Sequence, residues 1–363
     1  MENLVTSLAF WRGRRVLVTG HTGFKGGWLT LWLKKLGAQV SGFALAPPTD
    51  PSLFELAKVA DGIESTLGDV RDAPAVADAV RRARPEVVFH LAAQPLVRAG
   101  YADPAGTYAT NVMGAINLLE AVRSAGGVRA VVNVTSDKCY ENREWPWGYR
   151  ENEPLGGFDP YSSSKACAEM VTQSWRSAFF PPEQHAKHGT ALATARAGNV
   201  IGGGDWGADR LIPDFVRAIS NNTPLRIRSP DAVRPWQHVL DPLAGYLRLA
   251  ELLYGHGPDF GEAWNFGPGA EDARPVRWVL DQIHRAWGDV GGWELDAHPQ
   301  PHEASTLKLD CSKARGRLGW VPRLALPVAL EWTVEWYKAW RAGADMTAVC
   351  MDQLNRYETL AAP

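Results

Sequence analysis

Two short segments of the sequence carry side chains whose spacing could support the oxidation of an alcohol. Ser136-Asp137-Lys138 supplies a hydroxyl, a carboxylate and an ammonium group, and Tyr161 and Lys165 follow in a helical pattern. Residues four apart share one face of a helix, so the phenol of Tyr161 and the ammonium of Lys165 should project together. A free tyrosine has a pKa of about 10 and is a poor base at neutral pH, but a nearby ammonium favours the phenolate. The pair therefore predicts a base that takes the proton from a substrate hydroxyl.

The position of the first segment in the predicted fold also favours this chemistry. Residues 130–134 are mostly apolar or β-branched and predict a buried parallel strand, so Ser136 lies just beyond its carboxyl end. Open α/β sheets bind their ligands at that edge. The pattern Tyr-x-x-x-Lys is common by chance, and the hydroxyl at the strand end together with a glycine turn upstream favours the catalytic interpretation.

That glycine turn predicts a dinucleotide site near the amino terminus. Residues 14–19 form a short buried-strand pattern, Gly20 to Gly26 follow at once, and apolar residues then recur at helical spacing. The glycines would allow a tight turn and close packing, while the helix amino terminus presents N–H groups and a positive dipole to a pyrophosphate. A plain βα turn is the alternative.

Further cofactor contacts are predicted where later strands end. Asp69 could accept a hydrogen bond from an adenine amino group, or it could cap a helix. The second strand ends at Ala44, with neither an acidic residue for a ribose 2′-hydroxyl nor an arginine for a 2′-phosphate, so this position does not decide between NAD and NADP. Asn111 could be a polar tether between a helix and the sheet. The predicted cofactor-binding residues are Gly20, His21, Thr22, Gly23, Phe24, Lys25, Gly26, Asp69, Val70, Leu91, Ala92, Ala93, Asn111, Tyr161 and Lys165.

The alternation of strand and helix patterns predicts an α/β fold, a Rossmann-type doubly wound parallel sheet with a smaller carboxyl-terminal α+β substrate lobe. Buried strands are expected at 14–19, 39–44, 63–67, 86–91, 130–135 and 192–197, and shorter strands at 225–227 and 263–266. The predicted organisation is a cofactor-binding domain over 1–198 with 236–262 returning to it, a substrate lobe over 199–235 and 263–345, and a last helix or tail over 346–363.

Length and composition describe a globular protein, with 363 residues of which 45% are hydrophobic and 21% charged. The 38 basic residues nearly balance the 40 acidic ones, so we expect no nucleic-acid or membrane partner. The four cysteines show no close pairing and no accompanying histidine cluster, so neither disulfides nor a metal site is predicted, and a cytoplasmic location fits best. The amino terminus does not read as a secretory signal, and no apolar run reaches the ~20 residues of a membrane-spanning helix.

Long segments of the sequence resemble the extended short-chain dehydrogenase/reductase family, the NAD-dependent epimerases and dehydratases. The likeness covers nearly the whole chain and is most specific at 19–26, 135–140, 198–206 and 234–239. These segments look like those of the sugar-nucleotide 4,6-dehydratases that act on CDP-glucose. The resemblance implies NAD that is regenerated in each turnover, CDP-glucose as substrate, and a homodimer or dimer of dimers formed through the helices that begin near Pro104 and Tyr161.

The same resemblance implies a reaction in three stages. Tyr161, held with Ser136 and Lys165, would take the C4 hydroxyl proton while hydride passes to the nicotinamide. The C4 ketone acidifies the C5 hydrogen, water is lost across C5 and C6, and hydride returns to C6. Asp137 is the candidate acid for the departing hydroxyl, with a capping or salt-bridged carboxylate as the alternative.

Lys138 departs from the related dTDP-glucose dehydratases, which carry a glutamate at this position that is assigned as the C5 base. A lysine can act as a base only in its neutral form. Lys138 therefore either takes the C5 proton, which is the interpretation we favour, or positions Asp137 and water.

The resemblance also suggests which residues hold the nucleotide sugar. Arg234 can pair with pyrophosphate oxygens through its fork of donors, and Trp206 or Trp236 could supply apolar walls. The turn at 265–268 matches the family, but it is as consistent with a structural role as with substrate contact. The predicted substrate-binding residues are Gln94, Asn199, Arg210, Arg234, Trp236 and His302.

Two other functions fit parts of the same pattern. A sugar-nucleotide 4-epimerase would share the ketone intermediate but would not require Asp137 and Lys138 to eliminate water. A non-catalytic dinucleotide-sensing regulator would not need Tyr161 or Lys165, and both are present.

Overall fold

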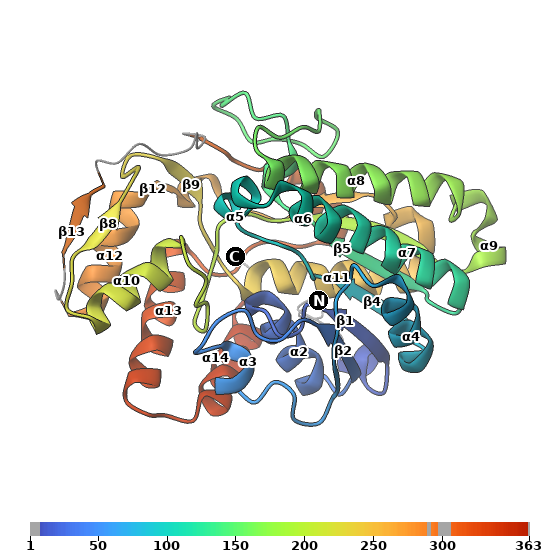
Figure 1. Cartoon of the computed structure of the whole chain (residues 1–363), viewed down its shortest axis with the longest axis horizontal. Helices are drawn as coiled ribbons and strands as arrows, with labels where there is room; N and C mark the ends of the chain where they lie inside the picture. Colours follow the sequence, from blue (N-terminus) through green and yellow to red (C-terminus); the bar gives the residue numbers. More distant parts are fainter. Residues whose placement is uncertain (1–7, 289–291, 297–305, 362–363) are drawn as a thin grey trace.

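The structure, a computed structural model, describes residues 8–288, 292–296 and 306–361. Across these residues the main sheet has seven parallel strands in the order β11-β6-β5-β4-β1-β2-β3 (Figure 1). These strands are β1 Arg15–Thr19, β2 Gln39–Ala44, β3 Glu64–Leu67, β4 Val87–His90, β5 Ala130–Val134, β6 Ala191–Arg196 and β11 Ala263–Asn265. The six longer strands expected from the sequence are confirmed to within one residue at each end.

The strands of the main sheet differ in burial. The central strands β4 and β5 are buried along their whole length, as their apolar sequences require. Strand β3, at one edge, has the polar sequence Glu-Ser-Thr-Leu and is largely exposed. Strand β11, at the other edge, is largely buried, so the polar sequence marks only the β3 edge as exposed.

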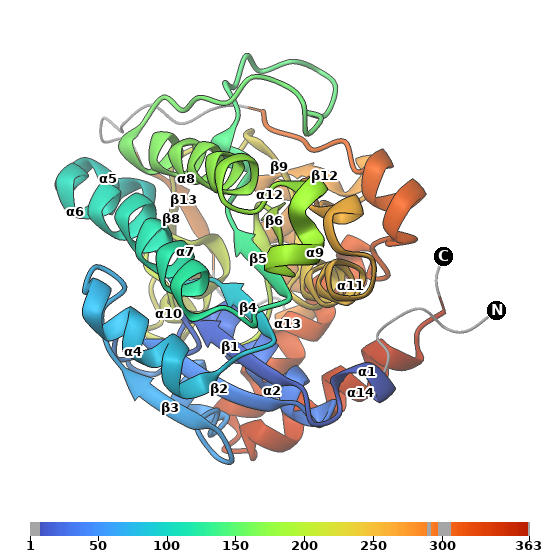
Figure 2. The ribbon, with the colours of Figure 1, turned by 90° about the vertical axis from the view of Figure 1, so that its right-hand side faces the viewer.

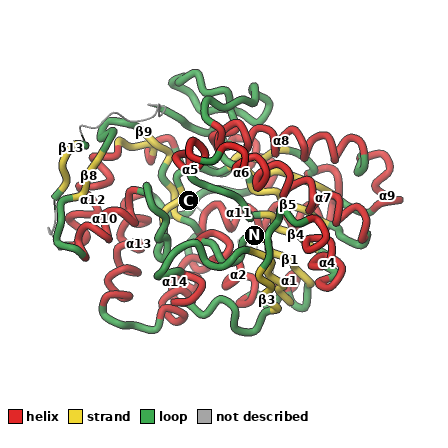
Figure 3. The backbone as a smooth tube through the Cα atoms, in the orientation of Figure 1, coloured by secondary structure: helices red, strands yellow, loops and turns green. Residues whose placement is uncertain are grey.

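Helices cover both faces of the sheet, as Figure 2 shows, and Figure 3 separates them from the strands by colour. Helices α4, α7 and α8 pack together on one face, and α2 and α11 contact strands from the other. The two hydrophobic clusters on these faces sandwich the strands. The helices are α1 Leu8–Trp11, α2 Phe24–Lys35, α3 Leu53–Leu56, α4 Ala73–Ala83, α5 Val97–Ala102, α6 Pro104–Tyr108, α7 Gly114–Ala125, α8 Pro160–Ala178, α9 His185–His188, α10 Leu211–Ser220, α11 Leu240–His256, α12 Val276–Trp287, α13 Leu326–Arg341 and α14 Met346–Thr359. Within the described ranges, no helix combines the length and apolarity needed to cross a bilayer.

The remaining strands form small two-stranded pairs beside the main sheet. Strand β8 pairs with β13, β9 with β12, and β7 with β10. In Figure 1 the first of these pairs lies with α10 and α12 at the end of the molecule away from α8 and α9. Their bounds are β7 Val200–Ile201, β8 Leu225–Ile227, β9 Val233–Pro235, β10 Gln237–His238, β12 Ala273–Pro275 and β13 Trp293–Leu295.

One expectation about the lobe is wrong. Strand β11 was expected in the substrate lobe, but it pairs in parallel with β6 and extends the main sheet. Within the segment 236–262, which was expected to return to the cofactor-binding domain, α11 packs on β5 and β6, whereas β10 pairs with β7 and not with the main sheet. Strands of two or three residues carry too little periodicity to identify their partners. The terminal segment is a helix, α14, which packs against α2.

A buried carboxylate links α11 to the carboxyl-terminal helix. Asp241 is completely buried, and its Oδ1 accepts hydrogen bonds from the Tyr357 hydroxyl and the Arg323 N–H, both at 2.8 Å. Its Oδ2 has no partner among the described residues. Burial raises the pKa of Asp241 from 3.8 to about 7, although the hydrogen bonds oppose the rise. The folded protein therefore binds this proton more tightly than the unfolded chain does.

We expect Asp241→Asn to remove a pH-dependent loss of stability. The contribution of the protonated acid is complete below about pH 4 and is lost as the pH rises to about 7, so the variant should gain stability over the wild type in that window. The gain should grow by roughly 3 kcal/mol between about pH 5 and pH 8, measured as the free energy of unfolding in urea. Asp352→Asn, on the exposed side of α14, is the control and should keep the wild-type pH dependence. Parallel curves for Asp241→Asn and the wild type would contradict this account.

Candidate active site

A cavity of about 1030 Å³ opens at the carboxyl ends of the central strands and extends to the lobe. Its walls include the glycine turn after β1, the ends of β4 and β5, the first turns of α8, and lobe segments around β8 and β9. This is the edge at which doubly wound sheets bind ligands. All five residues predicted to be catalytic line it: Ser136, Asp137, Lys138, Tyr161 and Lys165.

The glycine turn has the shape of a cradle for a dinucleotide. Gly20 has φ +80°, and a Cβ there would lie 2.7 Å from the backbone nitrogen of Ala92, which approaches from β4. A Cβ at Gly26 would overlap the carbonyl oxygen of Gly20. Helix α2 starts after Gly23 with no side-chain cap, so its first N–H groups are open to a ligand. These residues fit a bound pyrophosphate.

Most of the other predicted cofactor residues also line the cavity, but two side chains do not. The His21 ring is fully buried beneath the turn, where its Nε2 lies 2.7 Å from Ser65 Oγ and where a Cβ at Gly42 would overlap it. Burial lowers the pKa of His21 to about 4, so the ring is neutral at physiological pH. The amide of Asn111 is also occupied, by the Gln94 backbone and by Ser164 Oγ on α8. It thus joins its helix to the segment that follows β4, in line with the tether that the sequence suggested, and it also reaches α8.

Asp69 lies at the cavity wall but already has a partner. It accepts hydrogen bonds from the Arg71 backbone N–H at 2.9 Å and from Arg71 Nε at 2.8 Å. These hydrogen bonds outweigh burial and hold the pKa of Asp69 below its usual value. The helix-capping alternative is wrong, because Asp72 caps α4.

Helix α8 presents Tyr161 and Lys165 to the cavity. Asp159 caps the helix through the Ser162 N–H and Pro160 occupies its first position, so Tyr161 lies in the first turn and Lys165 in the next. Lys165 Nζ donates to the carbonyl oxygen of Val134, at the end of β5, over 3.3 Å. The helix start therefore places both side chains against the strand end.

Burial dominates the ionisation of this pair in the structure without ligand. It raises the pKa of Tyr161 to about 12, and the hydrogen bond with Ser136 offsets only part of that rise. It lowers the pKa of Lys165 to about 8, although Glu169 opposes the change. The phenol is thus neutral at physiological pH until a further positive charge favours its ionised form.

Ser136, Asp137 and Lys138 form a tight turn after β5. Ser136 Oγ donates to Asp137 Oδ1 over 3.0 Å and accepts from the Lys138 N–H over 3.2 Å. Asp137 Oδ2 is buried and has no partner among the described residues, and a Cβ at Gly198 would overlap its carboxylate. The Lys138 ammonium reaches the cavity with no hydrogen bond to the described part of the chain. Both residues line the cavity, and each has a polar group that makes no hydrogen bond within the described residues.

Lys25 brings a further cation to the same space. It lies in the first turn of α2 and lines the cavity. Burial lowers its pKa to about 8, and the charges of Lys165 and Arg210 lower it further, while Asp137 and Asp205 oppose this. Charges of the glycine turn and of the catalytic segments therefore act on one another across the cavity.

The predicted substrate-binding residues divide into three groups. Asn199, Arg210, Arg234 and Trp236 line the cavity. Gln94 is not among the lining residues, and its side chain bonds Thr107 Oγ1 and the Leu96 N–H. His302 lies outside the described residues.

Tertiary structure gives Arg210 an acidic partner and adds two arginines that the sequence patterns did not indicate. Arg210 Nη1 contacts both carboxylate oxygens of Asp205, at 2.8 and 2.9 Å. Burial opposes ionisation of Arg210, but Asp205 outweighs it and raises the arginine pKa. Arg98 and Arg228 also line the cavity, from α5 and from the segment after β8. A single arginine carries no local signal of its neighbours in the fold, so only the tertiary structure could identify these two.

Asn265 illustrates the opposite outcome. The family-like turn at 265–268 begins with this residue, whose Oδ1 accepts from the Tyr140 hydroxyl and whose Nδ2 donates to the Tyr149 and Asp310 carbonyls. It is completely buried. Its role is therefore to join β11 to neighbouring loops.

Comparison with known proteins gives consistent similarities. The family model described as NAD dependent epimerase/dehydratase family matches residues 16–267. The CDP-glucose 4,6-dehydratase of Salmonella typhimurium (strain LT2) is 55% identical over 348 residues, 96% of this chain and 97% of that protein. The UDP-glucose 4-epimerase of Mycolicibacterium smegmatis is 27% identical, covering 89% of this chain and 98% of that protein. Among solved structures, dTDP-glucose 4,6-dehydratase from Streptomyces venezuelae with NAD and TYD bound superimposes with a TM-score of 0.76 at 25% identity, covering 92% of this chain and 99% of that chain.

Proposed function

Because this chain belongs to the NAD dependent epimerase/dehydratase family, we propose that it converts CDP-D-glucose to CDP-4-dehydro-6-deoxy-D-glucose and water, a step in making a deoxysugar. The observation that carries this proposal is the site itself, where Asp137 lines the same cavity as Tyr161 and Lys165 and has a buried carboxylate oxygen with no hydrogen-bond partner among the described residues. A 4-epimerase needs no such acid. The 55% identity with a CDP-glucose 4,6-dehydratase supports the choice of nucleotide.

The cofactor is NAD, which when bound takes hydride from C4 of the glucose and returns it to C6. Tyr161 accepts the proton of the C4 hydroxyl, with Ser136 holding the phenol by a hydrogen bond. The Lys165 ammonium stabilises the phenolate, and the Val134 carbonyl orients that ammonium. Gly20, Gly23 and Gly26 keep the backbone of the turn close to the dinucleotide phosphates. His21 acts only beneath the turn, by supporting it.

The side chains of the Ser136–Lys138 turn after β5 then carry out the elimination of water. Asp137, in its protonated form, gives its proton to the departing C6 hydroxyl, and Lys138, as a neutral amine, takes the proton from C5 and gives one back to C5 when hydride returns to C6. Arg210 and Arg234 bind the diphosphate of the nucleotide sugar, and Trp236 supplies an apolar wall. The cofactor-binding domain thus holds the dinucleotide, and the lobe holds the diphosphate of the nucleotide sugar.

A panel of nucleotide sugars tests the reaction directly. The purified protein is incubated with CDP-, UDP- and dTDP-glucose, with and without added NAD, and the products are identified by NMR. We expect a 4-keto-6-deoxy sugar, formed fastest from CDP-glucose. CDP-galactose as the product would identify an epimerase instead, and no product from any sugar would overturn the proposal.

Replacing Lys138 with methionine tests the base. Methionine has similar length and flexibility but cannot accept a proton, so we expect turnover to fall by roughly 10²- to 10⁴-fold. Exchange of the C5 proton with deuterated water should be lost to the same extent, followed by NMR of recovered substrate and product. Intact C5 exchange in this variant would assign Lys138 a positioning role and the base to another group.

The same proposal includes assembly into a homodimer in the cytoplasm. Helices α6 and α8 pack together, and the neighbouring surface carries exposed Tyr101, Met113 and Met170, each at least 40% accessible. Such side chains suit a contact between two copies. A monomer in sedimentation experiments at micromolar concentration would contradict the dimer.

The cysteines are free thiols, a state that suits a reducing compartment.

A further inference from the structure

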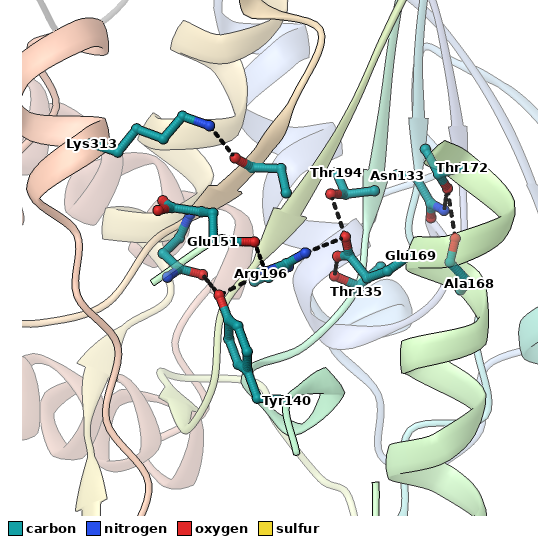
Figure 4. Close-up of polar contacts among 12 residues, drawn as sticks. Asn133, Thr135, Tyr140, Glu151, Ala168, Glu169, Thr172, Thr194, Arg196 and Lys313 are labelled. Carbon is teal, nitrogen blue, oxygen red and sulfur yellow. Dashed lines mark hydrogen bonds and ion pairs between the residues drawn. The ribbon is translucent and has the colours of Figure 1, made fainter. Parts of the chain in front are cut away.

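A buried ion pair lies directly behind the catalytic turn. Glu169 on α8 and Arg196 at the end of β6 approach to 2.8 Å, and only 3% of each side chain is exposed. Figure 4 shows this pair at the centre of a polar network. A buried pair of this kind carries a large desolvation cost and is weak evidence of a stabilising role, so its contacts must be considered.

These contacts hold the catalytic turn at both of its ends. The Thr135 hydroxyl, just before Ser136, donates to Glu169 Oε1. At the other end, the Tyr140 hydroxyl lies 2.7 Å from Arg196 Nη1, and the guanidinium also lies over the Tyr140 ring at 4.8 Å. The residues that flank the turn 136–139 therefore both bind the ion pair: Thr135 bonds Glu169, and Tyr140 bonds Arg196 (Figure 4).

The pair is in turn fixed to the sheet. Glu169 Oε2 accepts from Thr194 Oγ1 on β6 over 2.7 Å, and the Tyr140 hydroxyl donates to Asn265 on β11 over 2.7 Å. Arg196 Nη1 also donates to the Glu151 carbonyl over 3.1 Å. Movement of the pair would thus displace Thr135 and Tyr140 together.

We propose that Glu169 and Arg196 are positioning residues, which align the Ser136–Lys138 turn with Tyr161 and Lys165 for the dehydration. Glu169 lies one helical turn beyond Lys165 on the same helix, so a single carboxylate connects the two catalytic segments. Neither residue lines the cavity. The kinetic test of this inference rests on the proposed function. The structural test, by hydrogen exchange, does not depend on it.

The charge of Glu169 also acts on Lys165. Titratable groups near Lys165 are Tyr161 and Glu169 on α8, Cys139 in the turn, His90 on β4 and Lys25 on α2. Of these, Glu169 gives the strongest opposition to the lowering of the Lys165 pKa by burial. Loss of this charge should let the ammonium deprotonate at lower pH, and the then unpaired Arg196 would act in the same direction.

Glu169→Gln tests the proposal, with Thr172→Val as the matched control. Thr172 lies one turn further along α8 and makes a separate buried tether, accepting from Asn133 Nδ2 over 2.8 Å (Figure 4). We expect Glu169→Gln to lower kcat for CDP-glucose by roughly 100-fold with little change in KM. The alkaline limb of kcat/KM should move to lower pH by about one pH unit. Thr172→Val should change neither quantity.

Hydrogen exchange gives a readout that requires no activity. Amide exchange in the peptide spanning residues 136–139 should accelerate in Glu169→Gln and stay at the wild-type rate in Thr172→Val. The double variant Glu169→Gln/Arg196→Gln removes the unpaired charge, and it should recover stability but keep the fast exchange and the shifted pH limb. If Glu169→Gln matches Thr172→Val in exchange and in pH profile, the positioning role is overturned. If the wild type fails to convert CDP-glucose, the proposed function fails while the exchange comparison still decides this inference.

Discussion

Tyr161→Phe is expected to reduce turnover of CDP-glucose by roughly 10³-fold, because it removes the only atom of that side chain that can accept the C4 hydroxyl proton. The change keeps the ring, which is 8% exposed, and so should leave the fold intact. Oxidation at C4 comes first, so the variant should neither release a keto sugar nor reduce NAD in a single turnover. Rapid-mixing absorbance in the near ultraviolet measures the second quantity.

Tyr246→Phe is the matched control for this experiment. Tyr246 is also fully buried, and its hydroxyl has no hydrogen-bond partner among the described residues. Its removal therefore breaks no hydrogen bond within the described residues and should leave turnover unchanged. Full activity in Tyr161→Phe would assign the proton transfer to another group.

Asp137→Asn is expected to separate oxidation from elimination. The amide keeps the size of the carboxylate but cannot protonate the departing C6 hydroxyl, so loss of water should slow by about 10²- to 10⁴-fold, or roughly 3–5 kcal/mol in the barrier. Oxidation by Tyr161 should continue, so reduced NAD should accumulate after mixing with CDP-glucose. Stopped-flow absorbance and NMR of the quenched sugar measure the two steps.

Asp209→Asn provides the comparison for that variant. Asp209 lines the same cavity, but its side chain is 39% exposed and lies 3.3 Å from Arg98 at the rim. A surface change of this kind should alter turnover by no more than about twofold. If Asp137→Asn releases product at the wild-type rate, another acid assists the leaving hydroxyl.

The elements of the fold could be predicted because their signals are local. Strands β1, β4 and β5 are short, largely apolar runs, and the segment with Tyr161 and Lys165 has a helical pattern. The spacing of Tyr161 and Lys165 determines their shared face through helix geometry alone. Strand β11 was assigned to the substrate lobe because a strand of three residues does not indicate which strand it pairs with. Its pairing with β6 joins residues that are far apart in the chain.

The site was predictable only in part, for the same reason. The sequence by itself determined which segments reach the carboxyl edge of the sheet: the glycine turn, the Ser136–Lys138 turn and the start of α8. Only the tertiary structure decided that His21 faces Ser65 rather than the cavity, that the amide of Gln94 is occupied by Thr107 and Leu96, and that Arg210 meets Asp205. Backbone conformation follows from short-range sterics and periodic burial, whereas each side-chain pairing depends on distances set by the packing of the whole chain.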